Sequence, residues 1–569
     1  MSTTGPNISN ASRVGRYWLD SAGPCLPQAA EHLIDLARAE SDSRAEGLSA
    51  SACDLRDIVC VTPGRRSNRL LVQNLLDACH ERDLRLIPPR TITPGDMVDV
   101  MFPSALARPR ATPNELIYAW LRALRTQNPE TIEPLLPHAP KQDDLFTWHD
   151  VAKTLNTLHE ELAGERLAMA DVAETCENIE RFNEADRWRA IATVHETQQK
   201  ALTDLGLVDP HTARQKALTN DSPTDSTLVL IGVVDLNAQQ RAVIDAAADR
   251  THVMIHADES DAACFDAYGC VDENAWSSRE IELDDSKIIV ADRPPDQAQS
   301  VLQRLGQFNG SYAPDEITIG LGDEALADHL ESAGRWVDVD FHRASGRSLA
   351  ESRPGRLLRA LADWLRDQQF AQFATLLRHP DIEQYVRGHI EHRIDDADRA
   401  IEDWLTLLDR YFTDHLHGRL TGRWLGHEPF TRRLAAIWNA LQEVTGPINA
   451  ERSRPLGQWA EPMLHVLSRV YANVDESELN NAPAALNEAL TAIQNHLSGW
   501  SAMPESLQPD VNIATALRLA ANELAGARTP APIRRDEIEM LGWLELHLDT
   551  APALIITGFN DSNIPAAVH

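Results

Sequence analysis

The chain lacks any long run of apolar residues. None of its segments approaches the roughly 20 consecutive apolar residues that a membrane-spanning helix needs. Its N-terminal stretch, MSTTGPNISNASRVGRYW, also lacks the apolar segment of a secretory signal. We therefore expect a cytoplasmic protein that has neither a secretory signal nor a membrane as a partner.

Cysteine is scarce as well. The seven cysteines are an odd number in 569 residues, and no two of them form a C-x-x-C pair. This usage is typical of a reducing compartment and argues against a disulfide framework. HEELA at 159–163 lacks the second histidine of an H-E-x-x-H zinc motif, and HIEH at 389–392 suits a solvated helical face better than a metal site. We expect no metal and no cofactor in these residues.

Positive charge is the third deficit. The chain has 53 Lys and Arg residues against 86 Asp and Glu residues, which gives a formal net charge of −33. The simplest interpretation of this excess is a solubilising surface. Since a uniformly acidic surface repels DNA, any nucleic-acid site has to be a local basic groove or a channel read by shape. The composition argues against a protein that simply coats DNA.

What the chain does contain is a set of short runs rich in Val and Ile. A first cluster consists of DIVCVT (57–62), LRLIPP (84–89), STLVLIGVV (226–234) and THVMIHA (251–257). Continuous apolar runs of this length indicate strands buried on both faces, as in a parallel sheet covered by helices. Residues 113–219 instead show three- and four-residue apolar spacing with few breakers, which predicts a helical segment that interrupts the sheet.

A second cluster repeats this plan. The stretches 287–308 and 315–333 each predict a strand, a turn and a helix, and WVDVDF at 336–341 predicts a further strand. Residues 354–529 predict a second helical block, broken by turns such as HLHGRLTGRWLGHEPF. APALIITGF at 551–559 predicts a last strand. A sheet that ends on a strand without a following helix leads us to expect a truncated protein.

One turn has the layout of a phosphate-binding loop. It lies between a predicted strand and a predicted helix and reads Pro63-Gly64-Arg65-Arg66-Ser67-Asn68-Arg69. ATP binding would need backbone N–H groups around the phosphates, a lysine on the β and γ oxygens, and a hydroxyl on Mg²⁺. Gly64 keeps one flexible point, but no G-K-[ST] occurs anywhere in the chain. Arginine is not a plain substitute for lysine, because its planar fork is larger and coordinates differently.

Three interpretations of this degenerate loop stay open. The favoured one is a turn that preserves the fold after its chemistry has been lost. In the second, Arg65, Arg66 and Arg69 at a helix N-terminus hold an anion such as a DNA phosphate. In the third, ATP hydrolysis survives. The degenerate Walker B region argues against the third, because Asp235 is its one carboxylate where catalytic helicases carry two adjacent acids. We interpret Asp235 as the N-cap of the following helix.

The layout of two interrupted sheets resembles the superfamily 1 helicases of the UvrD type. Local sequences are similar to AddB, the helicase-like and nuclease subunit of the bacterial AddAB break-repair complex. The similar stretches are, in chain order, VTPGRRSNRLL (61–71), RWRAIATVHETQQKALTDLGLVDP (187–210), LVLIGVVDLNAQQRAVIDAA (228–247), ITIGLGDEALADHLE (317–331), FATLLRHPDI (373–382) and EIEMLGWLELHLDTAPALIITGFNDSNIP (537–565). The family's Asn-Glu-Gly after the last strand is replaced here by Asn560-Asp561-Ser562.

The resemblance implies an α/β fold with two RecA-like parallel-sheet cores, each interrupted by a helical insertion, and a truncated C-terminal part. The implied boundaries are 1–112 and 220–275 for the first core, 113–219 for its insertion, 276–353 and 530–569 for the second core, and 354–529 for its insertion. The family's PD-(D/E)XK nuclease and iron–sulfur cysteines have no counterpart in these residues.

For function, the resemblance implies a non-catalytic, helicase-like part of a helicase–nuclease complex for double-strand break repair. Its partners would be single-stranded or forked DNA and an AddA-like subunit that supplies ATP-driven translocation. Two alternatives stay open. The chain is the N-terminal part of a PD-(D/E)XK nuclease whose catalytic domain lies beyond residue 569, or it is a scaffold without a role on DNA, which the charge of −33 favours.

Overall fold

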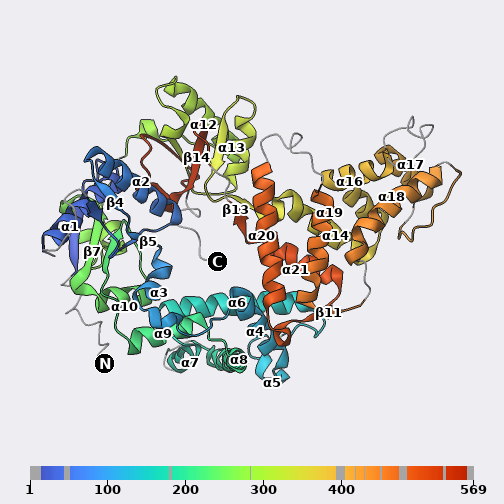
Figure 1. Ribbon diagram of the computed structural model, residues 1–569, viewed down its shortest axis with the longest axis horizontal. Helices are drawn as coiled ribbons and strands as arrows, with labels where there is room; N and C mark the ends of the chain where they lie inside the picture. Colours follow the sequence, from blue (N-terminus) through green and yellow to red (C-terminus); the bar gives the residue numbers. More distant parts are fainter. Residues whose placement is uncertain are drawn as a thin grey trace. The chain divides into compact units, whose positions relative to one another are not determined.

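The computed structural model forms two compact units (Figure 1). The first unit comprises Met1–Thr112, Ala119–His342 and Ile533–His569, and the second comprises Pro113–Tyr118 and Arg343–Pro532. The structure describes residues 14–43, 52–136, 138–176, 179, 182–281, 283–391, 404–416, 418–428, 430–448, 452–472, 483–529 and 533–560. Asp561, Ser562 and His392, which the sequence motifs include, lie outside the described residues.

The first unit contains a five-stranded sheet in which all neighbouring strands are parallel. Its order is β1 (Gly15–Leu19), β7 (Thr251–His256), β6 (Thr227–Ile231), β3 (Ile58–Val61) and β5 (Arg90–Ile92). Every residue of β3 is buried, because its four apolar residues face helices on both sides of the sheet. The expected parallel sheet is therefore confirmed.

Two details of this sheet differ from the sequence-based expectation. LRLIPP does not enter it: β4 (Arg85–Ile87) pairs with β2 (Ala52–Asp54) in a separate two-stranded sheet. The two prolines that follow have no N–H to donate to a ladder, so β5 begins after them and pairs with β3. The sheet also gains β1, which the sequence analysis missed.

Helices cover both faces of the five-stranded sheet. Helices α1 (Cys25–Ser43) and α2 (Arg65–Glu81) pack on the face that carries Ile58, Cys60, Val229 and Ile231. Helices α3 (Met97–Met101) and α10 (Ala238–Ala246) pack on the face that carries Val59, Val61, Leu228 and Leu230. Alternate residues of the same strands thus enter two different cores, which explains why the strands read as unbroken apolar runs.

The stretch between β5 and β6 is largely helical, as expected for 113–219. It contains α4 (Pro113–Thr126), α5 (Pro129–Ile132), α6 (Leu145–Gly164), α7 (Met169–Cys176), α8 (Ala185–Asp204) and α9 (Pro210–Asn220). Several of these helices start at an N-cap that accepts a backbone N–H, such as Asp144 for α6 and Asp209 for α9. The domain boundaries inferred from the resemblance stay predictions.

A second, four-stranded sheet also belongs to the first unit. Its order is β15 (Ala553–Thr557), β8 (Ile317–Leu321), β14 (Glu537–Gly542) and β9 (Asp340–Arg343), and β8 is parallel to both of its neighbours. Helices α12 (Pro294–Phe308) and α13 (Leu326–Gly334) cover one face. β9 begins near the end of the stretch expected at 336–341.

The strand expected at the start of 287–308 does not form. Ile288, Ile289 and Val290 are exposed, Val290 to 89%, and no strand begins there. Short α11 (Glu273–Ser277) precedes them in an acidic stretch. A run of three apolar residues between polar neighbours is too short to specify a strand when no neighbouring strand pairs with it.

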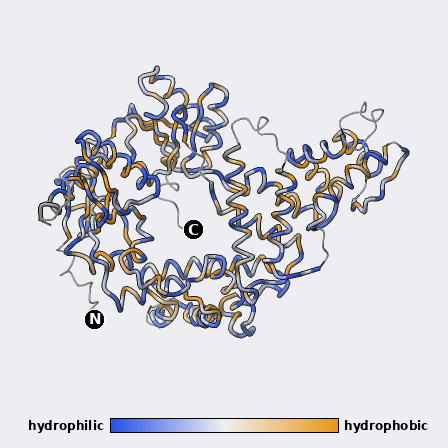
Figure 2. Tube along the Cα trace, viewed as in Figure 1, coloured by the Kyte–Doolittle hydropathy of each residue, from blue (hydrophilic) through white to orange (hydrophobic). Residues whose placement is uncertain are grey.

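The second unit is mainly helical. It contains α14 (Arg353–Asp367), α15 (Phe370–Leu377), α16 (Pro380–Glu391), α17 (Trp404–His415), α18 (Phe430–Thr445), α19 (Ala460–Tyr471), α20 (Pro483–Ala502) and α21 (Ile513–Ala525). Two short antiparallel pairs join β10 (Arg347–Ser348) to β13 (Arg528–Thr529) and β11 (Arg454–Pro455) to β12 (Asp510–Val511). Figure 2 shows hydrophobic and hydrophilic residues alternating along these helices. Within the described residues, no helix is both long and apolar enough to cross a membrane.

Candidate functional site

The degenerate phosphate loop joins β3 to α2, and Gly64 is the N-cap of that helix. No side chain caps the helix; instead the Asn68 N–H donates to the Gly64 carbonyl at 3.1 Å. The Thr62 hydroxyl lies 3.0 Å from the Gly64 carbonyl and 3.1 Å from Asn68 Oδ1. Ser67 and Asn68 are buried. Because the Ser67 hydroxyl is not presented to solvent, it is not placed to hold a Mg²⁺ ion outside the loop.

Arg66 is engaged by two carboxylates from the end of the chain. Its Nε donates to Glu539 Oε1 at 3.0 Å, and its Nη2 donates to Glu539 Oε2 at 2.5 Å and to Asp549 Oδ1 at 2.8 Å. All three side chains are largely buried, with exposed fractions of 12%, 17% and 6% in that order. Burial alone lowers the pKa of Arg66, but the hydrogen bonds and charges of Glu539 and Asp549 outweigh it and raise the pKa above its ordinary value. The guanidinium therefore stays charged inside a closed ion-pair network.

A 3₁₀ segment, Trp543–Leu548, lies between the two sheets and contacts both. Leu546 covers Gly320 of β8, where its Cδ1 is 2.5 Å from the position of a β-carbon. Leu548 covers Gly232 after β6 and belongs to the apolar core beneath α1 and α2. His547 Nε2 lies 2.8 Å from the Gly232 carbonyl oxygen. The two glycines allow this close approach, because any side chain at either position would collide with the segment.

A third carboxylate, that of Glu545, reaches the loop from the same segment. Its Oε1 lies 3.0 Å from where a β-carbon on Gly64 would stand. Together with Glu539 and Asp549, it places three acidic side chains around the N-terminal end of α2. A helix N-terminus attracts anions, and this is the end at which a phosphate-binding loop holds its phosphates. In this protein one carboxylate lies beside Gly64 and two more bind the Arg66 side chain, and their negative charge would repel a triphosphate.

The remaining predicted residues lie apart from this network. Arg65 and Arg69 are exposed on α2, and neither forms a hydrogen bond or ion pair with Glu539 or Asp549 among the described contacts. Asp235 is exposed after β6, and the prediction that it caps the next helix is wrong. The N-cap of α10 is Asn237, whose side chain accepts from the Gln240 N–H at 2.9 Å while Gln240 Oε1 accepts from the Asn237 N–H. Asn237 takes this role because it directly precedes the first helical residue.

Sequence reasoning missed Glu539, Glu545 and Asp549. They lie more than 470 residues after the loop, as the separation of 473 between Arg66 and Glu539 shows. No local pattern links acids at such distances to an arginine-rich turn. The only available signal was the unusual substitution of arginine for lysine, since arginine is the residue that pairs with carboxylates through a two-pronged geometry.

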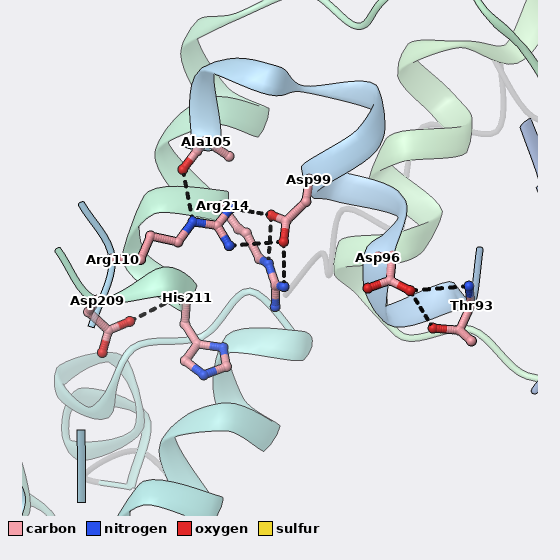
Figure 3. A network of polar contacts seen from close by, with 8 residues as sticks. All are labelled: Thr93, Asp96, Asp99, Ala105, Arg110, Asp209, His211 and Arg214. Carbon is pink, nitrogen blue, oxygen red and sulfur yellow. Dashed lines mark hydrogen bonds and ion pairs between the residues drawn. The ribbon is translucent and has the colours of Figure 1, made fainter. Parts of the chain in front are cut away.

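A second ion-pair network ties α9 to α3. Asp99 accepts from Arg110 Nη1 at 2.9 Å and from Arg214 Nε at 3.0 Å and Nη2 at 2.7 Å, so two guanidinium groups converge on one carboxylate (Figure 3). Burial raises the pKa of Asp99, but the hydrogen bonds from Arg214 and Arg110 outweigh it and lower the pKa to about 2. This network holds the end of the helical stretch against the first sheet and presents no free carboxylate for chemistry.

Three histidines surround Asp209 at the start of α9. His159 Nε2 lies 3.1 Å from Asp209 Oδ2, and the ring of His159 lies 4.5 Å from that of His195 and 5.3 Å from that of His211. Trp120 stacks on His195 with an angle of 13° between the rings. Among the described residues, no group of three or more His, Cys, Asp or Glu side chains has an arrangement that could hold a metal ion. We regard this cluster as a buried polar core.

Comparison with known proteins gives no family assignment. No protein-family model matches the chain, and no curated protein matches it either.

Proposed function

We propose that this chain is a non-catalytic, helicase-like part of a DNA-processing complex of the AddB kind. In this proposal two RecA-like cores, built on the two sheets, carry the helical stretches as insertions and hold or guide DNA in the cytoplasm. An AddA-like subunit supplies ATP-driven movement. The chain's own role is to bind single-stranded or forked DNA and not to hydrolyse nucleotide.

The observation that carries this proposal is the state of the phosphate loop. Arg66 lies in the first turn of α2, where a nucleotide-binding lysine would stand, and its Nε and Nη2 already donate to Glu539 and Asp549. A nucleotide would have to break this buried network and approach three carboxylates, which costs several kcal/mol before any contact is gained. The motor-like arrangement of loop, strand and helix is thus retained without an open phosphate site.

The first test is nucleotide binding. Purified chain is titrated with fluorescent ATP in the presence of Mg²⁺, and phosphate release is measured with and without DNA. We expect no saturable binding and no DNA-stimulated hydrolysis. A matched variant, Arg66→Lys with Glu539→Gln, restores an ammonium group and removes one carboxylate. If this variant binds nucleotide and the unmodified chain does not, the ion-pair network is what excludes the nucleotide. DNA-stimulated phosphate release from the unmodified chain would contradict the proposal.

The second test is DNA binding. A labelled forked oligonucleotide is titrated at several salt concentrations with the chain alone and with an AddA-like subunit. We expect binding that weakens as salt rises, because phosphate contacts release counterions. If the chain is instead a scaffold without a role on DNA, it should not bind the oligonucleotide even at low salt, either alone or with the AddA-like subunit. That result would contradict the proposed DNA role.

A further inference from the structure

The segment that runs from the end of α17 through the connection to the start of α18 has a local charge opposite to that of the whole chain. Residues 410–433, RYFTDHLHGRLTGRWLGHEPFTRR, contain five arginines and two carboxylates, an excess of three positive charges. The chain as a whole has a formal charge of −33. Figure 1 shows this connection in orange beside α17 and α18. In so acidic a protein, a cluster of arginines with interleaved aromatic residues calls for a structural or functional reason.

The first half of the connection is fixed to the start of α15. The Phe370 N–H donates to the Gly418 carbonyl at 2.7 Å, and the Leu420 N–H donates to the Gln368 carbonyl at 2.8 Å. These bonds enclose an antiparallel bridge between Gln369 and Arg419. The backbone of Arg419 is therefore held in a defined place, while its side chain is exposed.

The second half is fixed by Trp424. Its ring lies 5.2 Å from that of Tyr411 and 6.1 Å from that of Trp438. The Leu425 N–H donates to the Tyr411 hydroxyl at 3.3 Å. Gly422 has a φ of +78°, and a β-carbon there would lie 2.8 Å from Trp438 Nε1, so the turn needs glycine. Arg423, between these anchors, is exposed.

These anchors hold the backbone around Arg419 and Arg423 close to the segments that flank Phe412. Phe412 is 42% exposed, and its ring stacks on Phe370 with a centroid distance of 5.1 Å. Arg419 is bridged to Gln369, the residue before Phe370, and Arg423 lies two residues before the bond to Tyr411, the residue before Phe412. An exposed aromatic ring and two exposed arginines thus belong to neighbouring segments of the backbone.

The charges of these arginines are not used inside the protein. Within the described part of the chain, Arg410 and Arg423 form no hydrogen bond or ion pair, and Arg419 has one long contact of 3.5 Å with Gln368 Oε1. Of the two carboxylates in the stretch, Glu428 is engaged by Arg432 at 2.7 Å. Arginines that stabilise a fold are paired, as Arg66 is. These are held in place by the backbone and directed to solvent.

We propose that the surface formed by Arg410, Phe412, Arg419 and Arg423 binds single-stranded nucleic acid. The guanidinium groups contact phosphates, and one unpaired base stacks on the exposed face of Phe412. A duplex fits this surface less well, because its base faces are covered by their neighbours. The inference rests on the proposed DNA role and deepens it by naming the strand and the surface.

The test uses the full chain and a labelled oligothymidine, with binding followed by fluorescence anisotropy between low and moderate salt. The double variant Arg419→Gln/Arg423→Gln removes two contacts. Since each phosphate contact on a single strand contributes about 0.7 to the slope of log K against log salt, we expect the slope to fall by about 1.4 and the affinity at 50 mM salt to fall by roughly 10- to 100-fold.

A matched control removes the same charge elsewhere. Arg187 and Arg189 on α8 are each 51% exposed and lie beside Glu184 and Asp186. Arg187→Gln/Arg189→Gln should leave the salt slope unchanged. Phe412→Leu tests the stacking contact separately, because it leaves the charge of the surface unchanged. It should weaken single-strand binding about 5- to 150-fold, the equivalent of one lost stack, with no change of slope and little change on a blunt duplex.

The outcomes separate the two proposals. If the unmodified chain binds no DNA at low salt, the proposed function fails and this inference with it. If the unmodified chain binds but the arginine double variant behaves like its control, or Phe412→Leu binds like the unmodified chain, this surface is overturned while the proposed function stands. Thermal melting of the arginine variants should match that of the unmodified chain, because their side chains are exposed. Phe412→Leu loses part of its packing on Phe370, so its binding is measured well below its own melting temperature.

Discussion

Leu548 packs directly over Gly232. The Leu548 Cδ2 atom lies 2.6 Å from the position that a β-carbon on Gly232 would take, and Gly232 itself has a φ of +59°. This contact joins the 3₁₀ segment to the end of β6, and the His547 ring lies 2.8 Å from the Gly232 carbonyl oxygen. The segment therefore depends on a backbone position that accepts no side chain.

We predict that Gly232→Ala destabilises the first unit by about 2–4 kcal/mol, because left-handed strain adds to overpacking. The loss is measured as the free energy of opening of the β6 amides by hydrogen exchange. Gly306→Ala in α12 is the control. No atom lies within 4 Å of its added β-carbon, so it should stabilise its helix by up to about 1 kcal/mol. Equal protection of β6 in Gly232→Ala and the unmodified chain would show that the segment can move away.

We predict that Arg66→Met lowers the free energy of unfolding by about 3–5 kcal/mol, because it leaves two buried carboxylates without a cation. Arg66→Lys should cost less, since the charge remains and only the fork geometry is lost. The triple variant Arg66→Met/Glu539→Gln/Asp549→Asn should recover part of the loss, because no buried charge is left unpaired. Urea unfolding measures all three; a triple variant less stable than Arg66→Met would contradict the ion-pair explanation.

We predict that the α6–α8–α9 region loses stability as the pH falls from about 6.5 to about 4. Burial lowers the pKa of His195 to about 4, with a smaller contribution from His159 and against the attraction of Asp209. The unfolded chain therefore binds a proton in this window that the folded chain excludes. The free energy of unfolding should fall by about 3 kcal/mol in total. The loss should be complete once the pH is below the pKa of His195 in the folded chain.

Because the chain has 13 tryptophans, the transition is followed by hydrogen exchange of the α8 amides as a function of pH rather than by fluorescence. The nearby ionisable side chains are His159, His211, Asp209, Glu160 and Arg214. Burial lowers the pKa of His211 in the same direction, so the variant His195→Gln should remove part of the pH dependence and leave the rest. A variant with the full pH dependence would assign the effect to other groups.

We predict that Asp381→Ala destabilises the second unit by about 3 kcal/mol. The Asp381 side chain is fully buried, pairs with Arg353 and accepts from the Tyr471 hydroxyl at 2.7 Å. Burial and the nearby carboxylate raise the pKa of Tyr471, so the hydroxyl stays a donor at any ordinary pH. Removing the carboxylate leaves a buried hydroxyl and a half-buried guanidinium unpaired.

The matched control for that variant is Asp363→Ala. Asp363 is 46% exposed and pairs with Arg366 three residues along α14. Exposed pairs of this kind contribute less than about 1 kcal/mol. Thermal melting of the two variants side by side should show a clear loss only for Asp381→Ala; equal melting temperatures would mean that the buried network contributes little.

The sequence was informative where a physical pattern is local. β3 and β6 are continuous apolar runs because helices cover both of their faces, so their burial could be predicted. β1 could not be predicted, since GRYWL has no such pattern and becomes a strand by pairing with β7, so that Gly15 lies opposite His252. Ile288 to Val290 show the converse error, in which local propensity indicates a strand but no partner strand is present.

The candidate site was predictable only in part. The turn from Pro63 to Arg69 could be identified because strand, glycine and helix follow one another directly. Its role could not, because the side chains that close it come from Glu539 and Asp549, which no periodicity or spacing connects to Arg66. Ion pairs between distant segments leave no mark on a single sequence beyond the residue types themselves.

The network around Arg66 also affects how the protein is made. Its partners lie 473 and 483 residues further along the chain. A ribosome that adds about 5–20 residues per second needs roughly half a minute to a minute and a half to reach them. Throughout that interval the nascent first sheet has a guanidinium without its carboxylates, so the loop is completed only after Glu539 and Asp549 have been translated.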